Sequence, residues 1–133
     1  MSKFYVASGF KNKEIVRYVS QYLKNKGFIH TYDWTQNKRA STFENLKEIG
    51  HQERNAVLES DFIIVILPGG KGSHIELGIA LGQGKKIYLY SPDGELNNLD
   101  TTSTFYHLPE VNKCYGTIEN LLDKVTAAEC VYN

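Results

Sequence analysis

The chain has 133 residues, of which 41% are hydrophobic and 23% are charged, and fifteen basic residues balance fifteen acidic ones. This length and composition are typical of a single globular domain over residues 1–133, and they exclude a disordered or fibrous chain. The zero net charge argues against binding to a nucleic-acid polymer, and the longest apolar run, at 62–67, is too short to cross a membrane. The chain starts without a signal-peptide pattern and its two cysteines lack metal-ligand spacing, so we expect a cytoplasmic protein with reduced thiols.

Apolar residues along the chain alternate between strand spacing and helix spacing. We expect, in order, a strand at 3–7, a helix at 15–23, a strand at 28–32, a polar loop at 33–41, a helix at 42–60, a strand at 62–67, a glycine-rich turn at 68–72, a helix at 73–82, a strand at 86–90, a polar loop at 91–107, a strand at 113–115 and a helix at 117–128. Gly27 suits the position just past the first helix, where a left-handed backbone is common.

Strands that alternate with helices predict an α/β fold, here a flavodoxin-like (Rossmann-like) three-layer sandwich around a five-stranded parallel sheet. The strand at 62–67, FIIVIL, is apolar throughout, which is typical of a central parallel strand. Five strands suit the order 2-1-3-4-5, in which ligands bind at the carboxyl ends of the first and third strands. The loops at 8–12 and 68–74 meet there, so we expect the functional site between them.

The helix at 73–82 follows three glycines and contains a single acidic residue. Glycines such as Gly70 and Gly72 let the backbone approach a ligand, and the free N–H groups at a helix start suit an anion. Glu76 is the only charged residue between Gly72 and Gly84. A carboxylate buried with this apolar helix is costly unless it is paired or functional. Two interpretations stay open: Glu76 is a catalytic carboxylate, or it completes a capping box with Ser73.

Glu53 is a second acidic residue in an unexpected position. It lies in the middle of the face that Leu46, Ile49, Ala56 and Val57 mark as the core side of the helix at 42–60. A carboxylate there indicates either a partner at a ligand crevice or subunit interface, or a long side chain that reaches solvent.

Three further residues lie at the expected ligand side of the sheet. Asp33 and Trp34 follow the second strand, and Trp34 either stacks on a base or covers the edge of the core. Ser91 ends the fourth strand and is either a hydroxyl donor or a turn residue. The four histidines share no ligand spacing, so we expect no metal site.

Four groups of residues together resemble the nucleoside 2-deoxyribosyltransferase superfamily. They are, in order, FYVASGF at 4–10, YDW at 32–34, Glu53, and GSHIELG at 72–78. A sister group of these enzymes is the 2′-deoxynucleoside 5′-monophosphate N-glycosidases. Separately, PGGKGSHIE at 68–76 is similar to the motif of the lonely-guy phosphoribohydrolases, with Ser73 where threonine is usual.

The resemblance implies an enzyme that cleaves or transfers at the N-glycosidic bond of a nucleoside or its 5′-monophosphate. Glu76 would be the nucleophile, Tyr5 would orient it, and Glu53 would contact the sugar or assist the leaving base. The family usually has aspartate where this chain has Glu53, and its transferases carry an aspartate in the loop after the third strand, where this chain has PGGK at 68–71. The implied substrate contacts come from the surrounding loops: Ser8, Gly9, Phe10, Asp33, Trp34, Gly70, Gly72, Ser73 and Ser91.

The resemblance implies no cofactor. Because small members of the family complete their sites across a subunit interface, it also implies a homodimer or larger assembly. Two other functions compete on the same fold, since a flavodoxin-like sheet serves many purposes. One is a non-catalytic nucleotide-binding or signalling module, and the other is an enzyme that uses the same carboxylate to cleave NAD at its ribosyl–nicotinamide bond.

Overall fold

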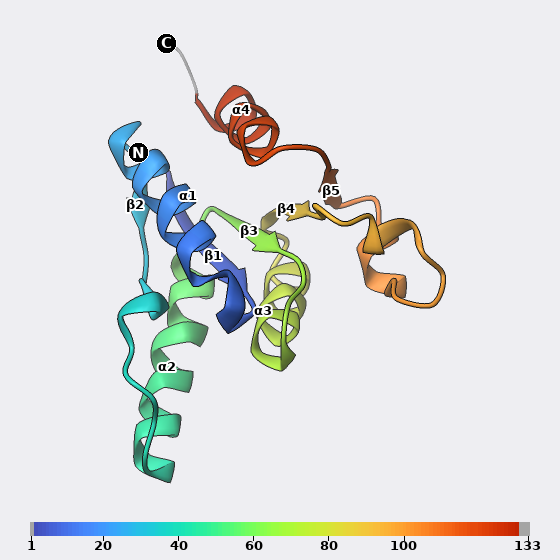
Figure 1. Cartoon of the computed structure of the whole chain (residues 1–133). Helices are drawn as coiled ribbons and strands as arrows, with labels where there is room; N and C mark the ends of the chain where they lie inside the picture. The colour runs from blue at the N-terminus through green and yellow to red at the C-terminus, as the bar shows by residue number, and fades with distance from the viewer. Residues whose placement is uncertain (1, 131–133) are drawn as a thin grey trace.

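The computed structural model describes residues 2–130 and confirms the predicted fold class (Figure 1). A parallel five-stranded sheet has the order β2-β1-β3-β4-β5, which is the predicted order. The strands are β1 (Lys3–Ser8), β2 (Ile29–His30), β3 (Phe62–Ile66), β4 (Lys86–Tyr90) and β5 (Val111–Cys114). All five residues of β3 are buried, because the strand has neighbours on both sides and helices over both faces.

Four helices cover the sheet in two pairs: α1 (Lys13–Asn25), α2 (Phe43–Glu59), α3 (Lys71–Gly82) and α4 (Ile118–Glu129). The Tyr18 hydroxyl of α1 lies 3.5 Å from the Glu119 carboxylate of α4, and α2 packs against α3. Right-handed crossovers place the two pairs on opposite faces of the sheet. Within the described residues, every helix is too short or too polar to span a lipid bilayer.

Most expected elements differ from the structure by one or two residues at their ends, and three of these differences concern α3, β2 and β5. The helix predicted at 73–82 begins at Lys71, because the Ser73 hydroxyl accepts from the Gly70 N–H at 2.7 Å and so stabilises an earlier start. The second strand is two residues long, since it is an edge strand that pairs with β1 alone before the chain turns. The fifth strand begins at Val111, two residues earlier than predicted.

The predicted core face of α2 is only partly correct. Ala56 and Val57 are buried against the sheet, but Leu46 is 56% exposed and Phe43 is 90% exposed. The 17-residue helix is about 25 Å long, whereas the five residues of β3 span about 17 Å. The N-terminal half of α2 therefore extends beyond the sheet (Figure 1).

Candidate active site

The carboxyl ends of β1 and β3 lie side by side, and hydrogen bonds join the loops that follow them. The Ser8 hydroxyl donates to the Ile66 carbonyl at 2.7 Å and accepts from the Asn12 amide at 2.9 Å. The same Asn12 amide donates to the Pro68 carbonyl at 3.1 Å, as does the Gly9 N–H at 3.3 Å. A Cβ atom at Gly9 would lie 2.9 Å from that carbonyl, so this close approach requires glycine.

A cavity of about 220 Å³ opens at this junction. It is lined by Tyr5, Ser8, Gly9, Phe10, Trp34, Glu53, Gly70, Gly72, Ser73 and Glu76. All ten were proposed from the sequence as site residues, and they come from β1, α2, α3 and three loops that are distant in the chain. Of the proposed residues, only Asp33 and Ser91 lie outside this lining.

Tyr5 and Glu76 form a buried pair in the lining of the cavity. The Tyr5 hydroxyl donates to Oε2 of Glu76 at 2.8 Å, across 71 positions of sequence. The Tyr5 side chain is fully buried, and Glu76 is 7% exposed. Glu76 lies six residues past Gly70, the residue that caps α3, so its interpretation as the capping-box glutamate is wrong. The backbone at that helix end is instead satisfied by Ser73.

Burial raises the pKa values of Tyr5, Glu76 and Glu53. It raises the pKa of Glu76 to about 8, although the hydrogen bond from Tyr5 opposes the rise and the nearby Glu53 charge adds to it. Burial also raises the pKa of Glu53. The pKa of Tyr5 lies far above its ordinary value, because the phenol is buried and faces the Glu76 and Glu53 carboxylates. Tyr5 is therefore a permanent hydrogen-bond donor to Glu76.

Two aromatic residues, Phe10 and Trp34, also line the cavity. Trp34 is 7% exposed, and its indole N–H donates to the Val6 carbonyl at 2.7 Å. Phe10 is 68% exposed, and its ring centre lies 6.3 Å from that of Trp34. Because the indole donor is already used, Trp34 offers a ligand an apolar wall and no polar contact.

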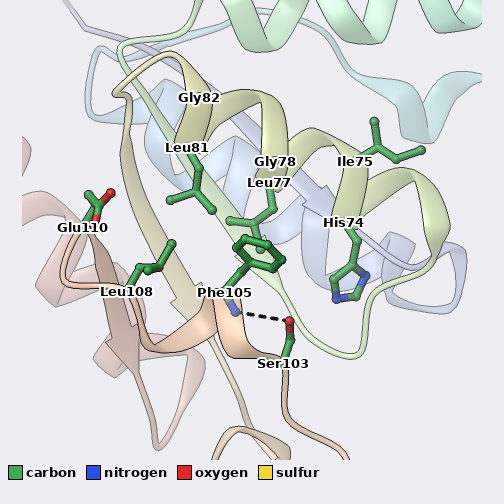
Figure 2. Close-up of a pocket in the computed structure, with 10 residues that line it drawn as sticks. All are labelled: His74, Ile75, Leu77, Gly78, Leu81, Gly82, Ser103, Phe105, Leu108 and Glu110. Atoms are coloured by element: carbon green, nitrogen blue, oxygen red, sulfur yellow. Dashed lines mark hydrogen bonds between the residues drawn. The ribbon is translucent and has the colours of Figure 1, made fainter.

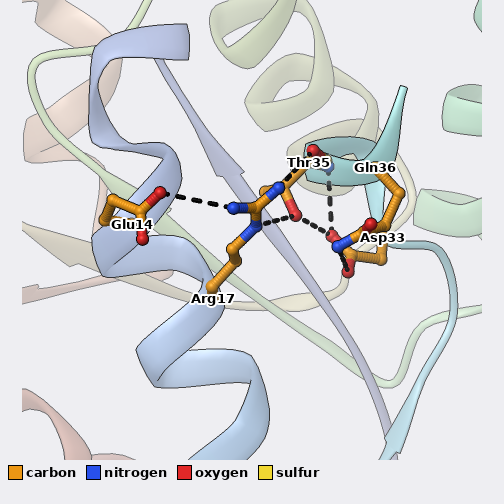
Figure 3. A network of polar contacts seen from close by, with 5 residues as sticks. All are labelled: Glu14, Arg17, Asp33, Thr35 and Gln36. Carbon is orange, nitrogen blue, oxygen red and sulfur yellow. Dashed lines mark hydrogen bonds and ion pairs between the residues drawn. The ribbon is translucent and has the colours of Figure 1, made fainter. Parts of the chain in front are cut away.

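The structure places Asp33 and Ser91 in other roles. The Asp33 carboxylate caps the short 3₁₀ turn Trp34–Gln36, where it accepts from the N–H of Thr35 at 3.0 Å and from its hydroxyl at 2.5 Å (Figure 3). Burial raises the pKa of this carboxyl, but the hydrogen bonds from Thr35 outweigh it and keep the pKa below its usual value. Ser91 is 2% exposed at the end of β4, and its N–H pairs with the Cys114 carbonyl of β5.

Sequence reasoning missed two polar groups that hold the site together. Asn12 joins the two loops of the junction, and Arg17 of α1 donates to the side chain and carbonyl of Thr35 (Figure 3). The asparagine directly before a helix was a usable signal, because such residues commonly bond to nearby backbone. The Arg17 contact joins residues 18 positions apart, and no local pattern indicates it.

A larger hollow of about 630 Å³ lies along α3 (Figure 2). It is lined mostly by apolar or glycine residues: His74, Ile75, Leu77, Gly78, Leu81, Gly82, Ser103, Phe105, Leu108 and Glu110. Its one carboxylate belongs to Glu110, which is exposed. The buried carboxylate with a fixed donor is in the smaller cavity, so we place the candidate active site there.

The family model for nucleoside 2-deoxyribosyltransferases matches residues 4–122. The chain belongs to the nucleoside 2-deoxyribosyltransferase family. The match extends from the first strand into the last helix, and it includes every residue that lines the cavity. A comparison with proteins of curated function gives no significant match.

Solved structures confirm the fold of this family member. The CMP N-glycosidase BcmB from Clostridium botulinum is 21% identical, with a TM-score of 0.61 over 92% of this chain and 97% of that chain. A conserved protein from Enterococcus faecalis V583 is 17% identical, with a TM-score of 0.69 over 96% of this chain and 99% of that chain. Both therefore cover nearly the whole of each chain.

Proposed function

We propose that the protein breaks the N-glycosidic bond of a 2′-deoxynucleoside 5′-monophosphate and passes the sugar to water or to a second base. The observation that carries this proposal is the buried Glu76 carboxylate, held by the Tyr5 hydroxyl at 2.8 Å in the cavity at the switch of strand order. Family membership supports chemistry at this bond. A carboxylate fixed by one strong donor suits a nucleophile, because it keeps its position as bonds change.

The first step transfers the sugar to the enzyme. An oxygen of ionised Glu76 forms a bond to C1′ of the sugar, while the C1′–N bond breaks and its electron pair stays on the base nitrogen. The transition state has oxocarbenium character, as in retaining glycoside hydrolysis. In the second step, water or another base attacks C1′, the ester bond to Glu76 breaks, and the carboxylate is restored.

We assign the proton transfer to Glu53. It lines the same cavity from α2, and burial raises the pKa of its carboxyl, which favours the protonated form needed to donate to the leaving base. After the base leaves, the resulting carboxylate accepts a proton from the attacking water. The extra methylene relative to the family's usual aspartate lets the carboxyl reach further from α2 into the cavity.

The start of α3 supplies the anion-binding end. The first backbone bond of the helix runs from the His74 N–H to the Gly70 carbonyl, so the N–H groups of residues 71–73 precede it and remain for a ligand. Lys71 is exposed at the first helical position and adds a positive charge. A 5′-phosphate satisfies both features. The structural relative from Clostridium botulinum is named as a CMP N-glycosidase, which agrees with a monophosphate substrate.

The test is a chromatographic screen for free base. The purified protein is incubated separately with deoxynucleosides, ribonucleosides, their 5′-monophosphates and NAD. We expect base release from a deoxynucleoside 5′-monophosphate, and loss of that release in Glu76→Gln with an unchanged circular dichroism spectrum. Glu110→Gln is the matched control, because it removes the carboxylate of the larger apolar hollow and should leave base release unchanged.

Each contrary outcome identifies another function. Monophosphate binding by the native protein without base release would indicate a nucleotide-binding module. Release of nicotinamide from NAD alone would indicate an NAD-cleaving enzyme. Full activity of Glu76→Gln, with loss of activity in Glu110→Gln, would move the active site to the hollow along α3.

A further inference from the structure

We infer that Arg17 and Thr35 are positioning residues that hold Trp34 as a wall of the cavity, and that they thereby set the affinity for the base of the substrate. This inference rests on the proposed function for its substrate class. Its structural content is a network of hydrogen bonds from α1 to the segment that carries Trp34 (Figure 3).

The network begins on a rigid element. Arg17 is located within α1, and its guanidinium makes two bonds to Thr35: Nε donates to Oγ1 at 3.1 Å, and Nη2 donates to the backbone carbonyl at 3.0 Å. A planar guanidinium that donates to both the side chain and the carbonyl of one residue fixes the position and the orientation of that residue. Thr35 is 2% exposed, so its end of both bonds is shielded from water, whereas the Arg17 side chain is 39% exposed.

The network continues past Trp34 on both sides of the chain. The Thr35 hydroxyl accepts from Arg17 and donates to Asp33, whose carboxylate also accepts from the Thr35 N–H. Trp34 lies between these two residues, so its backbone is held before and after. Its side chain reaches β1, where the indole N–H donates to the Val6 carbonyl at 2.7 Å. The ring is therefore held directly by its hydrogen bond to β1 and indirectly, through Thr35, by the two hydrogen bonds from Arg17 of α1.

The Arg17–Thr35 contact matters for ligand binding because Trp34 contributes apolar surface to the cavity. A wall that contacts the base in the ground state and in the transition state alike changes KM more than kcat. If Thr35 were released from Arg17, the segment 33–36 would lose its attachment to α1, and the ring would shift relative to Phe10 and Glu53. Arg17 and Thr35 themselves lie outside the cavity lining, so they act through Trp34.

The chain offers matched variants for the test. Thr35→Val keeps the shape but removes the hydroxyl, Thr35→Ser keeps the hydroxyl, and Arg17→Lys keeps the charge but loses the two-pronged contact. Glu14→Gln is the control, because it removes only the exposed ion pair at Nη1 of Arg17, at 3.3 Å. Trp34 is the single tryptophan of the chain, so tryptophan fluorescence reports on this wall alone.

Two measurements are made on each variant. Acrylamide quenching of Trp34 fluorescence reports how well the ring is held, and it needs no enzyme activity. Steady-state base release from deoxycytidine and deoxyadenosine 5′-monophosphates gives KM and kcat separately. We expect Thr35→Val and Arg17→Lys to increase quenching and to raise KM about tenfold, with kcat changed less than threefold, a loss of binding of about 1.4 kcal/mol. Thr35→Ser and Glu14→Gln should match the native protein.

The inference is overturned if Thr35→Val lowers the melting temperature but leaves quenching and KM at native values, because the contact is then structural only. It is also overturned if Glu14→Gln changes quenching as much as Arg17→Lys does. If the native protein releases no base from any nucleotide, the proposed function fails on its own. Acrylamide quenching in the same variants then tests by itself whether Arg17 and Thr35 hold Trp34 in place.

Discussion

The Tyr5 hydroxyl of β1 donates to the Glu76 carboxylate of α3 at 2.8 Å, and both side chains are buried. The bond joins a strand and a helix that are separated by most of two crossover units, so only the completed sheet creates it. It stabilises the ionised form of Glu76, whereas burial and the charge of Glu53 oppose ionisation. The balance raises the pKa of Glu76 to about 8, so the ionised, attacking form is the minority at pH 7 and increases as the pH rises toward 8.

Tyr5→Phe should lower kcat about 100-fold to 1,000-fold, as expected when one preorganised donor to a reacting oxygen is removed. The ring keeps its place in the core, so the melting temperature should change little and KM should stay within a few-fold of the native value. The measurement is steady-state base release, with thermal unfolding as the control for folding. A variant with native kcat would show that Tyr5 has no part in positioning Glu76.

Glu76→Gln should change how stability depends on pH. The pKa of Glu76 is raised in the folded state from its ordinary value of 4.5 to about 8, so the stability linked to this group is complete below about pH 4.5 and is lost as pH rises through about 8. The native protein should therefore lose about 2–4 kcal/mol of unfolding free energy relative to Glu76→Gln between these values. Urea unfolding at pH 5 and pH 9 measures the difference, and equal pH profiles for the two proteins would contradict the raised pKa.

Glu53→Gln should change the shape of the pH–rate profile. For a deoxynucleoside without phosphate, native kcat/KM should be bell-shaped in pH, because Glu76 must be ionised to attack and Glu53 must be protonated to donate to the leaving base. The variant should show a single rise as Glu76 ionises, and because the Glu53 charge raises the pKa of Glu76, the midpoint of this rise should lie below about pH 8. The maximum should also fall about 100-fold, because the proton donor to the leaving base is lost. A variant that keeps the bell shape would contradict the assignment of Glu53 as the proton donor.

The fold and most of the site could be predicted from the sequence because their signals are local. Five strands that alternate with helices predicted the strand order, the apolar run of β3 indicated a central strand, and the glycines after it indicated the junction where Ser8 and Gly70 line one cavity. Glu76 stood out because an isolated charge in an apolar helix is costly. Both open alternatives for Glu76 were compatible with its spacing, and only the actual start of α3 at Lys71 separates them.

Asp33 and Ser91 lie outside the cavity lining because tertiary contacts decide their positions. Asp33 follows the second strand as a ligand residue would, yet its carboxylate turns back to Thr35 and caps a 3₁₀ turn. Ser91 ends β4 at the expected edge, but the pairing of β4 with β5 buries it. The exposed half of α2 was predicted as core because its apolar spacing continues past the end of the sheet.

The exposed half of α2 leads to the prediction of a homodimer. Leu46 is 56% exposed and lies seven residues before Glu53, so both are on the same face of the helix. A second copy that covers Leu46 and Phe43 would also close the cavity beside Glu53. Light scattering should give twice the monomer mass at micromolar concentration. Leu46→Asp should give a monomer with at least tenfold lower kcat/KM, and a native monomer with full activity would contradict the prediction.

The last prediction is a preference for the 5′-phosphate, which follows from the start of α3 and the loop after β1. The N–H groups of residues 71–73 precede the first backbone bond of α3, Lys71 is exposed beside them, and the loops at 8–10 and 69–73 contain no acidic residue. A charge-assisted contact contributes about 1.5–3 kcal/mol, so kcat/KM for a monophosphate should exceed that for its nucleoside by about tenfold to a hundredfold.

Salt and two substitutions separate the sources of that preference. Added salt should weaken it, because Lys71 is exposed and its charge is screened. Lys71→Gln should reduce the preference for the monophosphate by removing this charge. The preference that remains in the variant should depend less on salt. Ser8→Ala should reduce it through the loop, since the Ser8 hydroxyl is bonded to Ile66 and Asn12 and holds the junction in shape. Equal kcat/KM for a deoxynucleoside and its 5′-monophosphate in the native protein would contradict the phosphate site and favour a nucleoside as the substrate.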